Sequence, residues 1–93
     1  MTKSTVPIFK IFLQTPNNAW FITVPTISLI GDFISMTINY EGLDILKSWA
    51  AYDCMNGETI MDSEKSLGEW MALNPSINGI DMEIIIKEVI FWQ

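Results

Sequence analysis

The sequence contains no histidine, no arginine and only one cysteine among its 93 residues. Histidine is the commonest general acid or base in enzymes, so its absence removes the usual catalytic group. One thiol cannot form an internal disulfide, and without histidine it cannot complete a zinc site. We therefore expect no enzymatic activity, no metal and no cofactor. We interpret Cys54 as a small buried residue of a protein in a reducing compartment.

Long apolar runs and clustered glycines are also missing. No apolar stretch reaches the roughly 18 residues that a membrane-spanning helix needs. Lys10 interrupts the first apolar stretch too early for a signal peptide. The isolated glycines form no phosphate-binding loop, and pairs such as Asp62 and Glu64 are typical of a solvated surface. These absences predict a soluble, cytoplasmic, non-catalytic protein.

The charge is strongly acidic and unevenly distributed. The formal net charge is −6, and residues 41–69 hold seven carboxylates against two lysines, a local net charge of −5. Nucleic-acid binders need cations, and arginine above all, to hold phosphates and guanine edges. We therefore expect no direct binding to nucleic acid or to an anionic membrane. The charge favours a cationic protein as partner, such as a nuclease or a nucleic-acid-binding effector.

Two functional hypotheses follow from this charge. The first is a small acidic inhibitor that blocks a basic nucleic-acid-acting protein, either as a toxin-immunity protein or as a phage-encoded anti-defence inhibitor of a host nuclease complex. Its partner-binding residues would be carboxylates and nearby aromatics, which steer and anchor a basic partner. These residues are Asp53, Glu58, Asp62, Glu64, Glu69, Trp49, Tyr52 and Trp70. Alternatively, these charges only keep the chain soluble.

The second hypothesis is a non-catalytic structural or assembly subunit that forms a homo-oligomer, of which a homodimer is the simplest form. The strands predicted at Phe9–Leu13 and Met82–Trp92 could extend a sheet across such an interface. This hypothesis predicts self-association that does not depend on the acidic residues.

Alternation of apolar residues predicts several strands. Residues 7–15 and 33–40 alternate with period two, which is typical of half-buried strands, and residues 20–24 are predicted as a further strand. Residues 20–40 are interpreted as β-runs that turn on Gly31-Asp32, so that an antiparallel meander occupies the first 40 residues. The apolar run of residues 82–92 predicts a long strand in the middle of the sheet.

The region after Gly42 admits two readings. Leu43, Leu46 and Ala50 follow a helical repeat that Asn56-Gly57 would cap, and this reading is favoured. The rival reading makes Asn56-Gly57 the turn of a β-hairpin. Further on, Asp62 or Ser63 is expected to cap a helix that ends before Pro75.

Together these elements predict one α+β domain over residues 1–93. It would consist of an antiparallel sheet of four to five strands with one or two helices packed on one face. The predicted core comprises Phe9, Ile11, Leu13, Phe21, Ile34, Met36, Ile38, Leu46, Trp49, Leu67, Trp70, Ile84 and Ile86.

Overall fold

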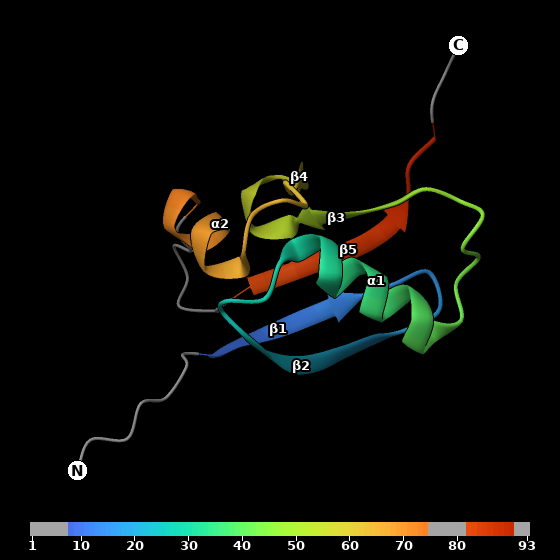
Figure 1. Ribbon diagram of the computed structural model, residues 1–93, viewed down its shortest axis with the longest axis horizontal. Coiled ribbons are helices and arrows are strands. Elements are labelled where there is room, and N and C mark those ends of the chain that lie inside the picture. The colour runs from blue at the N-terminus through green and yellow to red at the C-terminus, as the bar shows by residue number, and fades with distance from the viewer. Residues whose placement is uncertain (1–7, 75–81, 91–93) are drawn as a thin grey trace.

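The computed structural model describes residues 8–74 and 82–90 (Figure 1). Two strands come first, followed by a helix, two further strands joined by a 3-10 turn, a short helix and a last strand. The elements are β1 (Ile8–Gln14), β2 (Ala19–Pro25), α1 (Ile30–Glu41), β3 (Trp49–Asp53), η1 (Cys54–Asn56), β4 (Thr59–Ile60), α2 (Leu67–Leu73) and β5 (Met82–Glu88).

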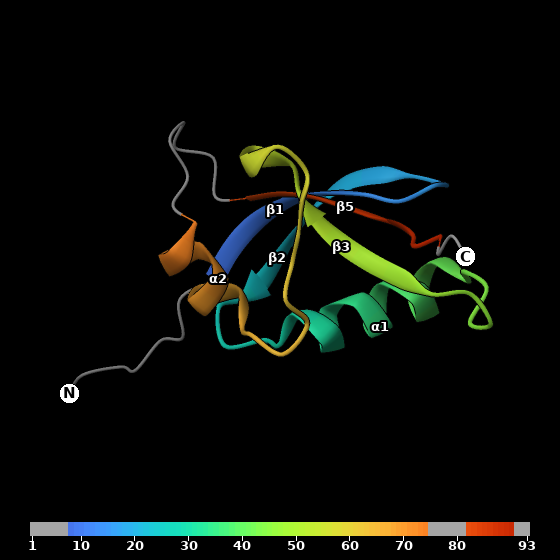
Figure 2. The ribbon, with the colours of Figure 1, turned by 90° about the horizontal axis from the view of Figure 1, so that it is seen from above.

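The strands form one mixed sheet in the order β2-β1-β5-β3-β4. β1 and β5 run parallel, and the other neighbouring pairs are antiparallel. Both α-helices lie on the same side of the sheet, and neither covers the other face, which is called the open face here (Figure 2). The predicted α+β fold, an antiparallel sheet of four to five strands with one or two helices on one face, is confirmed; the sheet has five strands and is mostly antiparallel. Within it, the meander is wrong, because α1 separates β2 from β3.

The core lies between the sheet and the helices. Ile11 and Leu13 of β1 pair with Met82 and Ile84 of β5, and all four side chains are at most 1% exposed. Burying each contributes about 1.5–3 kcal/mol. β5 has a neighbour on each side, as its apolar run predicted, and ends at Glu88. The predicted strand continues to Trp92, but Val89 and Ile90 lie outside the strand, and Phe91 and Trp92 lie outside the described residues.

The first major correction concerns α1, which was predicted as a strand. Its sequence carries both periods, because buried Ile30, Phe33, Ile34 and Thr37 also repeat at helical spacing. One helical face can then cover the sheet, and this burial outweighs the β-propensity of the isoleucines and threonine. Gly42 ends the helix in a left-handed conformation with φ of 64°.

The second correction concerns residues 43–57, which were predicted to be helical. A hairpin is present, as in the rival reading, because β3 pairs antiparallel with β4, but residues 54–58 join the strands instead of a tight turn on Asn56-Gly57. Gly57 and Glu58 both have positive φ, and the chain reverses its direction at these two residues. Ala50 and Ala51 favour a helix by propensity, but both are buried within β3, where small side chains fit the crowded sheet.

The predicted second helix is present, but it begins later than expected. Ser66, rather than Asp62 or Ser63, is its N-cap. The Ser66 hydroxyl accepts from Glu69 N, and the Glu69 carboxylate accepts from Ser66 N at 2.8 Å, which completes a capping box.

Most of the predicted core is buried or packed against the core cluster, with three exceptions. Phe21, Met36 and Leu46 are 60%, 51% and 91% exposed. Phe21 lies on the open sheet face, Met36 on the flank of α1 beside β2, and Leu46 in the loop before β3. Each was assigned from the wrong element or the wrong face.

Candidate functional site

The structure places the predicted partner-binding residues on several elements and with different exposure. Glu58, Asp62, Glu64 and Glu69 are exposed, but they are distributed along the chain from the β3–β4 turn to α2. Tyr52 lies on the open sheet face, with the ammonium of Lys87 4.7 Å from its ring centre. Of the remaining three residues, Asp53 and Trp70 are buried and Trp49 is half-buried.

Asp53 and Trp70 are 2% and 7% exposed and bind each other. Trp70 Nε1 donates to Asp53 Oδ2 at 2.8 Å, and Met55 N donates to Asp53 Oδ1 at 3.0 Å. Trp49 is half-buried, and its indole donates to the Asp44 carbonyl at 2.8 Å. The Asp53–Trp70 contact satisfies buried polar groups and connects α2 to β3, which is a structural role.

Cys54 has the properties of an unreactive thiol. Burial is the main cause that raises the pKa of its thiol, and the negative charges of Glu83, Glu58 and Asp53 raise it further. A reactive cysteine needs the opposite shift and a nearby cation. Among the described residues, no group of three or more histidines, cysteines or acidic residues could hold a metal ion.

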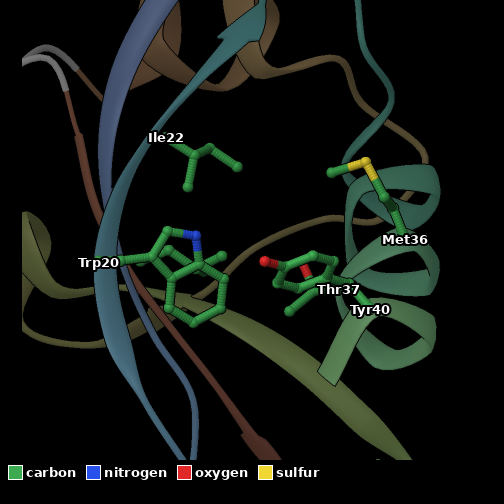
Figure 3. A pocket seen from close by; sticks show the side chains of 6 residues that line it. Trp20, Ile22, Met36, Thr37 and Tyr40 are labelled. Carbon is green, nitrogen blue, oxygen red and sulfur yellow. The ribbon is translucent and has the colours of Figure 1, made fainter. Parts of the chain in front are cut away.

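The feature that sequence reasoning missed is an apolar pocket between β2 and α1 (Figure 3). Leu13 and Thr37, both almost fully buried, lie deepest in it. Trp20 and Ile22 of β2 face Met36 and Tyr40 of α1. The Trp20 and Tyr40 rings lie 6.0 Å apart at an interplanar angle of 43°. The alternation of β2 and the helical spacing of α1 together predict this pocket, but only once residues 30–41 are assigned to a helix.

The size of the pocket limits what it can hold. Its volume is about 210 Å³, whereas pockets for drug-sized molecules and cofactors typically measure about 300–1,000 Å³. One bulky apolar side chain is a better fit. A larger hollow of about 420 Å³ lies on the other side of α1, lined by Ser35, Ile38, Asn39 and Ile45. Half of its lining residues are polar, and it borders no strand edge.

The pocket lies directly beside an open strand edge. β2 is the outermost strand of the sheet and pairs with β1 alone among the described strands. Its sequence, AWFITVP, carries no charge over seven residues. Edge strands are usually protected by charged residues, shortening or a bulge, because their free N–H and C=O groups can pair with another chain. Within β2 only Pro25, at its end, has such an effect.

Comparison with known proteins identifies the fold. No protein-family model and no curated protein sequence matches the chain. The crystal structure of Trypanosoma brucei ATG8 matches with a TM-score of 0.70 and 12% identity over 92% of this chain and 77% of that one. The N-terminal ubiquitin-like domain of the 4931431F19Rik protein matches with a TM-score of 0.63 and 10% identity, over 100% and 86% of the two chains. The NMR structure of an Arabidopsis thaliana protein matches with a TM-score of 0.61 and 13% identity, over 97% and 96%. The chain therefore has a ubiquitin-like fold.

This result overturns the inhibitor hypothesis. Structures similar to the chain are ubiquitin-like and ATG8-like folds, which do not fit a toxin-immunity protein or a phage anti-defence inhibitor. The error came from treating an acidic segment as a binding surface, although its Asp53 is buried and accepts a hydrogen bond from the buried Trp70. In the part of the chain that the structure describes, no helix is long and apolar enough to cross a membrane.

Proposed function

We propose that the chain is a non-catalytic protein-interaction module that binds an extended segment of a partner protein at the edge of β2. The observation that carries this proposal is the apolar pocket next to an uncharged outer strand. An added strand would pair with the β2 backbone, and one of its side chains would enter the pocket.

The two parts of the site supply different things. Backbone pairing along β2 gives affinity with little sequence preference, because every residue except proline offers the same N–H and C=O groups. The pocket then selects for a bulky apolar side chain. Trp20 and Tyr40 suit such contacts because aromatic rings offer large, rigid surfaces.

The absence of histidine and the raised pKa of the Cys54 thiol support a non-catalytic role. The single cysteine is consistent with the cytoplasmic location expected above. Both remain parts of this proposal.

The test compares proteins captured from a lysate of the source organism by the tagged chain and by two double variants. Met36→Ala/Tyr40→Ala removes two pocket walls that are 51% and 77% exposed. The matched control, Leu46→Ala/Leu73→Ala, removes two apolar side chains that are 91% and 65% exposed and lie outside the pocket. A partner lost by the first variant and retained by the second supports the proposal. Partners retained by both variants would contradict it.

A further inference from the structure

We infer that the segment bound at β2 carries basic residues on both sides of its apolar anchor, and that Asp32 and Glu41 select for them. This inference rests on the proposed function and adds the charge of the partner. It places the cationic partner expected from the net charge at the β2–α1 groove, here defined as the pocket together with the adjoining edge of β2.

The groove is apolar along its length and acidic at both ends. Its lining residues carry no charge. Asp32 lies one helical turn before Met36, on the side of α1 that leads to Tyr40, and is exposed in the first turn. Glu41 follows Tyr40 directly and is the last residue of α1.

A hydrogen bond holds Glu41 beside the start of β2. Thr15 Oγ1 donates to the Glu41 carboxylate at 2.9 Å. Thr15 lies in the turn between β1 and β2, where its hydroxyl also accepts from Asn18 N at 3.1 Å. The carboxylate is thus fixed at the Trp20 end of the groove.

The position of Glu41 is unfavourable for the helix itself. The C-terminus of a helix carries partial negative charge, so an anion there is destabilising and a cation is preferred. The last turn of α1 contains no basic residue. A residue that opposes a local rule is a candidate for a functional role. A bound cation would relieve this repulsion.

The described lysines are engaged elsewhere. Lys47 and Lys87 pair with Glu88 and Glu58, at 3.7 and 3.3 Å. Lys10 lies over the Phe21 ring on the open face, 4.8 Å from its centre. Lys65 lies in the loop before α2, where its charge acts on Glu69. The carboxylates at the two ends of the groove therefore face a partner of opposite charge, in a chain whose net charge is −6.

The test is a selection of binders to the full chain from a displayed library of random linear peptides. We expect the selected peptides to share one bulky apolar residue with lysine or arginine on both sides. Affinities of the tightest peptide are then measured for three double variants. Asp32→Asn/Glu41→Gln removes both charges and keeps the oxygen that accepts from Thr15. Glu58→Gln/Glu88→Gln removes two charges from the β3–β5 side, and Met36→Ala/Tyr40→Ala opens the pocket.

Loss of the two groove charges should weaken binding about three- to tenfold at low ionic strength, and less at high ionic strength. Glu58→Gln/Glu88→Gln should change affinity less than twofold, because salt largely screens the interaction between a bound peptide and charges on the distant side of the sheet. The pocket variant should weaken binding more than either. Thermal melts of each variant show whether a lower affinity reflects unfolding.

Each other outcome has a definite meaning. Selected peptides that need the pocket but have acidic or uncharged flanks would overturn the charge inference and leave the proposed function standing. The same holds if both charge variants weaken binding equally. If no selected peptide depends on the pocket, or if a second copy of the chain occupies the β2 edge, both the inference and the proposed peptide site are wrong.

Discussion

The two outer strands of the sheet differ in length, charge and neighbours. β2 has seven residues, none of them charged, and borders the apolar pocket. β4 has two residues and follows Glu58, whose carboxylate pairs with Lys87. A short edge with charged neighbours is protected against strand addition, and a long uncharged edge is open to it. The comparison supports the proposal that partner binding uses the β2 side of this ubiquitin-like sheet and not the β4 side.

The largest expected effect comes from breaking the β4 side. Asp53→Ala leaves the buried Trp70 indole N–H without its partner and should lower the free energy of unfolding by about 2–4 kcal/mol. Hydrogen exchange should accelerate in β3, β4 and α2 more than in β2. Chemical denaturation and exchange measurements on the full chain check both points.

The matched control for that variant is Asp62→Ala. The Asp62 carboxylate also accepts a backbone hydrogen bond, from Glu64 N at 2.9 Å, but it is exposed. Its loss should cost less than about 1 kcal/mol. Equal costs for the two variants would show that the Asp53–Trp70 contact has no special part in stabilising the β4 side.

A smaller effect is expected at the start of α2. Ser66→Ala removes the hydroxyl that accepts from Glu69 N and should cost about 1 kcal/mol. Binding at the β2–α1 groove should not change. Denaturation gives the stability, and a titration with a groove-binding peptide gives the affinity. A weaker affinity of the Ser66→Ala variant would show that the α2 cap influences the β2–α1 groove, and it would contradict the independence of the two sides of the sheet.

The same capping box predicts a pH dependence. Hydrogen bonds from Ser66 lower the pKa of the Glu69 carboxyl below 4.5 in the folded chain. This contribution to stability is fully present above pH 4.5, and it is lost as the pH falls through the lower folded pKa. Glu69→Gln should therefore flatten the acid side of the stability profile. An unchanged profile would show that the charge of Glu69 adds nothing to the cap.

The smallest effect concerns the turn into β4. Glu58 has φ of 56°, a conformation that favours glycine. Glu58→Gly should relieve this strain but lose a surface ion pair with Lys87, for a net stabilisation of about 0.5 kcal/mol. Lys87→Gln measures the loss of the ion pair alone. If Glu58→Gly destabilises more than Lys87→Gln, the turn is not strained.

Sequence alone predicted much of the fold, namely β1, β2, the central β5, the later helix and the α+β class. The prediction failed for residues 30–41, where a strand pattern and a helix pattern coincide. These residues suit a strand by composition and a helix by the spacing of Phe33, Ile34 and Thr37. It failed again at Ala50 and Ala51, whose burial in β3 depends on neighbours distant in sequence. Local patterns do not contain that information.

The candidate site was out of reach for a related reason. The pocket needs Trp20 and Ile22 opposite Met36 and Tyr40, and this juxtaposition exists only when residues 30–41 form a helix beside β2. Charge density drew attention instead to residues 41–69, where the buried Asp53 has a structural role as the acceptor of the Trp70 hydrogen bond.

The central claim, that the β2 edge and its pocket form the binding surface, is tested most directly by an NMR titration of the full chain with the tightest selected peptide. We predict that the backbone amides of β2, the Trp20 indole and the Met36 methyl group shift on binding, while β3 and β4 stay unchanged. Shifts confined to the open sheet face, around Phe12, Phe21 and Tyr52, would contradict the account.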